Sequence, residues 1–149
     1  MANHTMNHAT LKDLKDTAAI EKEIGDAEDW LNANGFTKAS NILAYPYGAY
    51  DARVLQVMQS RRAGRTVQDD TATTPPPDKR TIKIRNVDHT ITPTTLKEHI
   101  DAAVNVGGVC LFMFHKLVRG TATSGIEYNV SNFQEVVDYA FSGELISIP

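Results

Sequence analysis

The stretch His4-Thr5-Met6-Asn7-His8 is the point from which we interpret this chain, because it sets two imidazoles four residues apart. At that spacing both rings can turn toward one point, either from a helical turn or from a tight loop between a strand and a helix. Neutral imidazole is a good ligand for zinc and its first-row neighbours, and two such ligands leave room for a carboxylate and a water. The spacing therefore predicts a metal site at His4 and His8, with solvated histidines as the alternative.

Two later segments strengthen this interpretation. Ala44-Tyr45-Pro46-Tyr47-Gly48-Ala49-Tyr50-Asp51 is a turn-rich loop, and Leu111-Phe112-Met113-Phe114-His115 is an apolar run that ends in a histidine. With the first stretch, and in this order, they resemble the motifs of the NodB-type polysaccharide deacetylases, the carbohydrate esterases of family four. The resemblance runs over nearly the whole chain and treats residues 1–149 as one domain.

The resemblance implies metal-dependent hydrolysis of N-acetyl or O-acetyl groups on a polysaccharide. His4 and His8 match the family's two histidine ligands. Zinc is the expected divalent metal, with cobalt, nickel or manganese as alternatives. The metal would polarise the acetyl carbonyl and activate a bound water.

Four further residues acquire roles from the resemblance. Pro46 and Tyr47 match the loop whose tyrosine N–H helps to bind the oxyanion, and a simple turn is the alternative. His115 matches the general acid that protonates the leaving amine, and a histidine that caps a buried strand is the alternative. Leu117 matches the apolar position that lines the acetyl pocket. Pro46 and Leu117 are therefore the expected substrate-binding residues.

One family motif, T-F-D-D-G, is missing from the sequence. Its aspartates supply the third metal ligand and the general base, it would lie upstream of His4, and neither Asp13 nor Asp16 matches it. Ala44 stands where many relatives carry an arginine that orients the base. Arg85 is a candidate replacement, and a surface arginine is the alternative. We therefore expect little or no activity from the chain as given, and the alternative function is a non-catalytic carbohydrate-binding or assembly module derived from a deacetylase.

Helical and strand patterns alternate along the chain, which predicts a parallel α/β fold. Apolar spacing, caps and glycines place helices at 17–34, after Asp51, at 95–106 and from Ser131, and strands at 41–44, 65–68, 81–87, 109–114 and 145–148. The family's fold would make this an incomplete distorted (β/α) barrel, with about five strands present. We also expect Ile20 and Ile24 on the buried face of the first helix, with Asp16 or Thr17 as its cap, and Asp51 as the cap of the next helix. Trp30 and Val104 are expected in the core, and residues 109–114 are expected to be buried on both faces.

Composition narrows the class of protein. Of 149 residues, 42% are hydrophobic and 22% charged, which is typical of a soluble globular domain. A net charge of −3 gives no sign of the basic surface that nucleic-acid-binding proteins have. We interpret Arg61, Arg62 and Arg65 as a solvated helix end. Cys110 is the only cysteine, so no intramolecular disulfide can form. No apolar run approaches the roughly 20 residues that span a bilayer, and no signal peptide pattern is present.

Partners follow from the resemblance and from the open barrel. The expected substrate is a polysaccharide of unknown type, and the family suggests an extracellular or cell-surface location. An open barrel edge exposes unpaired strand groups, which predicts self-association or a second chain that supplies the missing part. The whole interpretation depends on one spatial prediction, that His4, His8 and His115 converge with the Tyr47 amide.

Overall fold

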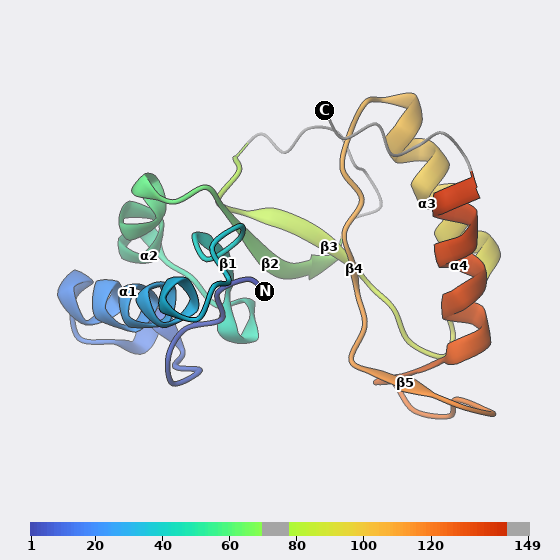
Figure 1. The fold of residues 1–149 in the computed structure, drawn as a ribbon, viewed down its shortest axis with the longest axis horizontal. Helices are drawn as coiled ribbons and strands as arrows, with labels where there is room; N and C mark the ends of the chain where they lie inside the picture. The colour runs from blue at the N-terminus through green and yellow to red at the C-terminus, as the bar shows by residue number, and fades with distance from the viewer. Residues whose placement is uncertain (70–77, 143–149) are drawn as a thin grey trace. The chain divides into compact units, whose positions relative to one another are not determined.

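The computed structural model describes residues 1–69 and 78–142, which fall into two compact units (Figure 1). The described part of the first unit is residues 1–68 and 78–83, and that of the second is residue 69 and residues 84–142. Two expectations from the sequence are affected: the last strand, at 145–148, lies outside the described residues, and so do residues 70–77 of a proline-rich loop expected at 69–79.

The first unit contains two helices and a pair of parallel strands. Helix α1 (Thr17–Ala33) begins at Asp16, whose carboxylate accepts a hydrogen bond from the Ala19 N–H at 2.8 Å. Strand β1 (Ile42–Ala44) runs parallel to β2 (Ala63–Asp69), and helix α2 (Ala52–Val57) lies between them in the chain. Asp51 caps α2 as predicted, because its side chain accepts a hydrogen bond from the Val54 N–H at 3.0 Å. Three 3-10 turns complete the unit: η1 (Leu11–Asp13), η2 (Pro46–Gly48) and η3 (Met58–Ser60).

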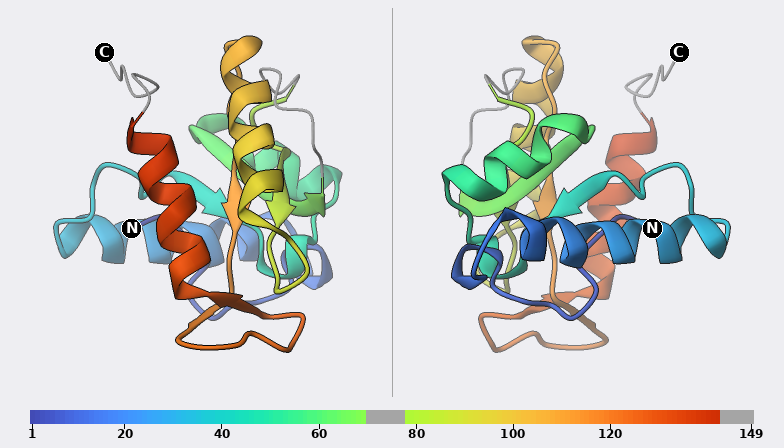
Figure 2. Two further views of the ribbon diagram at one scale, coloured as in Figure 1. Left: turned by 90° about the vertical axis from the view of Figure 1, so that its right-hand side faces the viewer. Right: turned by 90° about the vertical axis from the view of Figure 1, so that its left-hand side faces the viewer.

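The core of this unit forms where α1, α2 and β1 turn their apolar residues toward one another, with the two helices side by side (Figure 2). Its fully buried side chains are Leu11, Ile20, Ile24, Leu43, Tyr45, Val54 and Met58. The chain before His4 is fixed to the same core, because the Asn3 N–H donates to the Ile42 carbonyl and the Ala44 N–H donates to the Asn3 carbonyl, each at 2.9 Å. The backbone that delivers His4 is therefore continuous with the edge of β1.

Arg61 is not part of a solvated helix end, so that interpretation is wrong for this residue. It is only 5% exposed, and its guanidinium donates to the two carboxylate oxygens of Glu21 at 3.0 and 2.6 Å. A bidentate pair of this kind is stronger and more directional than an ordinary surface ion pair. The hydrogen bonds from Arg61 hold the pKa of Glu21 below its ordinary value. The pair ties α1 to η3.

The second unit contains two pairs of parallel strands and two helices. Strand β3 (Ile82–Asn86) pairs with β4 (Phe112–Met113), and β5 (Lys116–Val118) pairs with β6 (Glu127–Asn129). Helices α3 (Pro93–Asn105) and α4 (Val130–Ser142) lie side by side (Figure 2). Its buried residues are Val87, Leu96, Tyr128 and Val136, with Phe112, Phe114 and Phe133 packed against them. Helices alternate with parallel strands in both units, so the predicted α/β class is confirmed.

Both helices of the second unit begin earlier than the sequence suggests. The Thr92 hydroxyl accepts a hydrogen bond from the Thr95 N–H at 3.2 Å, which makes Thr92 the cap of α3 and Pro93 its first residue. The Asn129 side chain accepts from the Ser131 N–H at 2.7 Å and so takes the capping position expected of Ser131. The β5–β6 pair was not predicted, because its strands are only three residues long.

Burial also corrects three expectations. Trp30 is 51% exposed and is therefore not a core residue. Val109 and Leu111 are 54% and 36% exposed, so the apolar run before His115 is not covered on both faces. Val104, expected on the buried face of its helix, is 46% exposed. In each case an apolar residue remains at the surface, which a hydrophobic pattern alone does not reveal.

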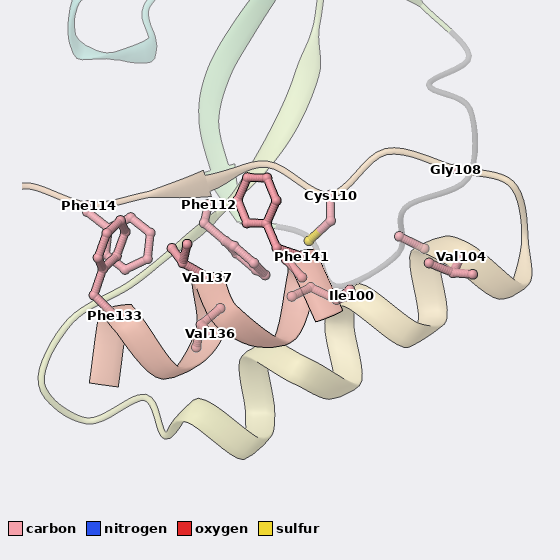
Figure 3. Close-up of a pocket in the computed structure, with 12 residues that line it drawn as sticks. Ile100, Val104, Gly108, Cys110, Phe112, Phe114, Phe133, Val136, Val137 and Phe141 are labelled. Carbon is pink, nitrogen blue, oxygen red and sulfur yellow. The ribbon is translucent and has the colours of Figure 1, made fainter. Parts of the chain in front are cut away.

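An apolar cavity of about 320 Å³ lies between α3, α4 and the segment that leads into β4 (Figure 3). Its lining includes Ile100, Phe112, Phe133 and Phe141, and the Cys110 side chain points into it. Burial raises the pKa of the Cys110 thiol to about 11. The thiol is therefore protonated at neutral pH, as expected for a small hydrophobic side chain.

Candidate functional site

The two histidines of the opening stretch lie next to each other in the first unit. Their Nε2 atoms are 3.0 Å apart, and the rings meet edge to face with centroids 4.6 Å apart. Both side chains are exposed. Thr5 and His8 have φ angles of 64° and 56°, so the stretch is a tight loop rather than a helical turn. The loop turns both imidazoles toward one point.

A backbone carbonyl determines which nitrogen of His4 is free. The Nδ1 atom of His4 lies 2.7 Å from the Ala44 carbonyl oxygen. A carbonyl only accepts hydrogen bonds, so Nδ1 carries the proton and the neutral ring keeps its lone pair on Nε2. The Nε2–H of His8 can donate to that lone pair. Histidine ligands of metals are commonly oriented by such a second contact.

Imidazole nitrogens are ligands that zinc and its first-row neighbours accept, so the two Nε2 atoms would be the donors of any metal bound here. Within residues 1–69 and 78–142, no group of three or more histidine, cysteine, aspartate or glutamate side chains is placed to hold a metal. Asp16 is occupied as the α1 cap, which agrees with its exclusion as a ligand.

Tyr47 lies against this pair. Its ring meets that of His8 edge to face, with centroids 4.8 Å apart, and it is 68% exposed. Pro46 opens the 3-10 turn η2 and is buried, and Tyr47 itself has a φ of 56° and a ψ of 10°. Because the first N–H groups of a helical turn have no partner inside the turn, this loop can offer a backbone donor beside the histidines. The ring of Pro46 fixes its own φ angle, which restricts the backbone at the start of this turn.

Two neighbours of Tyr47 in the same motif, to which the sequence analysis assigns no role of their own, hold its loop in place. The Tyr45 side chain is fully buried, and its hydroxyl donates to the Arg80 carbonyl at 2.7 Å. Burial raises the pKa of Tyr45 well above its ordinary value. Gly48 has a φ of 66°, and a β-carbon at this position would lie 2.3 Å from Cγ2 of Val67. Only glycine fits there, so the loop is closely packed on β2.

The remaining predicted site residues belong to the second unit. His115 follows the C-terminal end of β4 and is exposed, and Leu117 lies in β5 with 41% exposure. Arg85 forms an ion pair with Asp69 at 3.3 Å, which gives the arginine a structural role. His4, His8 and Tyr47 belong to the first unit, and the convergence of His115 with them stays a prediction.

Comparisons with known proteins support the relationship that the motifs predict. Residues 1–64 match the profile of the polysaccharide deacetylase family, and this range contains His4, His8 and the Tyr47 loop. A comparison with curated proteins finds no match. Among solved structures, the chain is similar to the deacetylase PplD of Streptococcus pyogenes in complex with acetate, with a TM-score of 0.58 and 20% sequence identity.

The structural match covers 66% of this chain and 43% of the streptococcal chain, so it spans less than half of that deacetylase. At this identity, the likeness establishes the fold, and the structure therefore corresponds to part of a deacetylase-type barrel. Within the part of the chain that the structure describes, no helix is both long and apolar enough to cross a membrane.

Proposed function

We propose that this chain, which is related to the polysaccharide deacetylases through its first 64 residues, carries part of a metal-dependent site for removing N- or O-acetyl groups from a polysaccharide. The observation that carries the proposal is the 3.0 Å separation of the two Nε2 atoms, with His4 oriented by the Ala44 carbonyl. The acetate in the structure of the streptococcal relative, which is the acid product expected of such a hydrolysis, supports an acetyl group as the substrate.

Each residue has a defined task in this proposal. His4 and His8 hold a divalent ion, most simply zinc. Bound there, the metal supplies Lewis acidity toward the acetyl carbonyl and lowers the pKa of a water. The Tyr47 N–H donates to the oxyanion that develops on the carbonyl oxygen, and His115 donates a proton to the leaving nitrogen or oxygen. Pro46 fixes the loop, and Leu117 contacts the acetyl methyl group.

Two functions remain to be separated by experiment. The sequence offers no aspartate that matches the third ligand or the general base, so we expect acetate release by this chain to be slow or absent. This same gap favours the second candidate, a carbohydrate-binding or assembly module that has kept the loop without its chemistry. A second, different chain that supplies the carboxylates would restore the first.

Equilibrium dialysis against Zn²⁺ tests the proposal. We expect the wild type to bind one zinc ion with micromolar affinity, and His8→Ala to lose at least about tenfold in affinity because one ligand is removed. His99→Ala, on α3, is the matched control and should bind like the wild type. Acetate release from N-acetylglucosamine oligomers, with and without zinc, then measures any turnover. Absence of zinc binding, together with binding of the oligomer, would favour the non-catalytic module.

A further inference from the structure

One carboxylate on α1, that of Glu23, holds the centre of the histidine loop. Its Oε2 accepts a hydrogen bond from the Asn7 N–H at 3.0 Å, and its Oε1 accepts one from the Asn7 side-chain amide at 2.6 Å. The Glu23 backbone carbonyl accepts a third, from the Met6 N–H at 3.0 Å. Glu23 thus fixes both residues that precede His8.

The loop needs this support because of its backbone conformation. Thr5 and His8 both have positive φ angles, which residues with a β-carbon rarely adopt without contacts that hold them. On the His4 side, the buried Asn3 side chain accepts from the Thr5 N–H at 2.8 Å and donates to the Ile24 carbonyl at 2.9 Å. On the His8 side, Glu23 holds the loop to α1 through Met6 and Asn7.

Glu23 does not form a third ligand beside His4 and His8, since among the residues that the structure describes no three His, Cys, Asp or Glu side chains are placed to hold a metal. Both of its carboxylate oxygens accept hydrogen bonds from Asn7. Its charge makes these hydrogen bonds stronger than those of a neutral acceptor. The Glu23 side chain can therefore influence His8 by holding Asn7, the residue before it in the loop.

We propose that Glu23 is a positioning residue of the proposed metal site. By holding Asn7, it keeps Nε2 of His8 close enough to Nε2 of His4 for both atoms to bind one metal ion. This inference rests on the proposed function, since it assigns Glu23 a role toward the same metal. It adds a residue that lies fifteen positions after His8 and that the H-T-x-x-H spacing does not include.

The test uses the full chain and two readouts. Zn²⁺ affinity by equilibrium dialysis should fall about tenfold or more in Glu23→Ala, the size typical for loss of a residue that orients a ligand. Glu23→Gln keeps one acceptor and should fall between that variant and the wild type. Asp29→Ala, an exposed acid on the same helix, is the matched control and should bind like the wild type.

The second readout is hydrogen exchange of the Asn7 amide in metal-free protein. It should be faster in Glu23→Ala and unchanged in Asp29→Ala, with a helical circular dichroism signal equal to that of the wild type. Should Glu23→Ala unfold, Asn7→Ala removes the side-chain half of the contact from an exposed loop and should also weaken zinc binding.

The two proposals fail in different ways. A wild type that binds no zinc overturns the proposed function, and with it the role of Glu23 toward a metal. A wild type that binds zinc while folded Glu23→Ala and Asn7→Ala bind it equally well overturns the inference about Glu23 and leaves the proposed function standing.

Discussion

His4 is oriented by the backbone of β1: its Nδ1 lies 2.7 Å from the Ala44 carbonyl, and its Nε2 faces that of His8 at 3.0 Å. Ala44 is also the last residue before the Tyr45–Gly48 loop, so the end of one strand positions both His4 and the start of that loop. This arrangement explains how two segments of the first unit, residues 4–8 and the Tyr45–Gly48 loop, come to lie together at the surface. It also makes the site sensitive to changes in the loop that follows β1.

Gly48→Ala should disturb that loop. The new β-carbon would meet Val67 at 2.3 Å in a backbone with positive φ, so strain and a steric clash add together. We expect a loss of about 2–4 kcal/mol in the free energy of unfolding, measured by urea denaturation. Gly35→Ala is the control, because Gly35 also has positive φ but nothing lies within 4 Å of the added carbon. It should cost only about 1 kcal/mol; equal losses in the two variants would show that the Val67 contact is unimportant.

The Glu21–Arg61 pair should make stability depend on pH in the acid range. Hydrogen bonds from Arg61 lower the pKa of Glu21 in the folded protein. A carboxylate with a lowered folded pKa stabilises the protein above its unfolded pKa of about 4.3, and this contribution is lost as the pH falls through the folded value. Wild type should therefore lose stability more steeply than Glu21→Gln below about pH 5.

Urea denaturation at a series of pH values measures this difference, with Glu98→Gln on α3 as the control for removing a surface charge. We expect the stability curves of wild type and Glu21→Gln to converge toward low pH. Parallel curves over the whole range would show that the ion pair does not contribute to stability in solution.

Cys110 should react slowly with thiol reagents in the folded protein. Its thiol points into the apolar cavity, and burial raises its pKa to about 11 from the 9.0 of a free thiol. Two pKa units correspond to about a hundredfold less thiolate near neutral pH, and the thiolate is the reactive form. Iodoacetamide labelling at pH 7.5, native against urea-unfolded, measures the ratio.

The same shift predicts the behaviour of stability at high pH. Because the folded state keeps the thiol protonated, its contribution is complete below the unfolded pKa and declines as the pH rises toward 11. Cys110→Ala should remove that decline. Equal labelling rates in the native and unfolded states would instead place Cys110 at an open surface.

Local sequence signals predicted the elements whose formation depends on neighbouring residues. Asp16 and Asp51 were expected at helix starts, and both carboxylates accept the capping hydrogen bond. The spacing of Ile20 and Ile24 likewise gave the buried face of α1. Caps and helical periodicity act within one or two turns, so they can be read without knowing the rest of the fold.

Contacts between distant residues could not be predicted in this way. Arg61 is buried where its guanidinium donates to Glu21, forty residues earlier in the chain. Trp30 was expected in the core from its place on the first helix, but it is 51% exposed. The relation to deacetylases came from motifs, and the comparisons confirm it.

For the proposed site, the spacing predicted His4 and His8 as ligands, but it could not predict the groups that contact and orient them. The Ala44 carbonyl is a backbone atom, and a backbone atom leaves no signature in the residue type. Glu23 resembles any other acid on an exposed helix until the loop is folded against it. The residue type and spacing in the sequence can suggest a metal ligand. A residue that orients the ligand can be recognised only from its contacts in the folded structure.

The central claim, a metal held by His4 and His8, is tested most directly by imidazole NMR of the ¹⁵N-histidine-labelled chain, which has five histidines. Substoichiometric Co²⁺ is added, and the broadening of each ring signal is recorded. We expect the His4 and His8 signals to disappear first, that of His115 to broaden if it converges with them, and those of His89 and His99 to persist. Unchanged His4 and His8 signals, or equal broadening of all five rings, would contradict the claim.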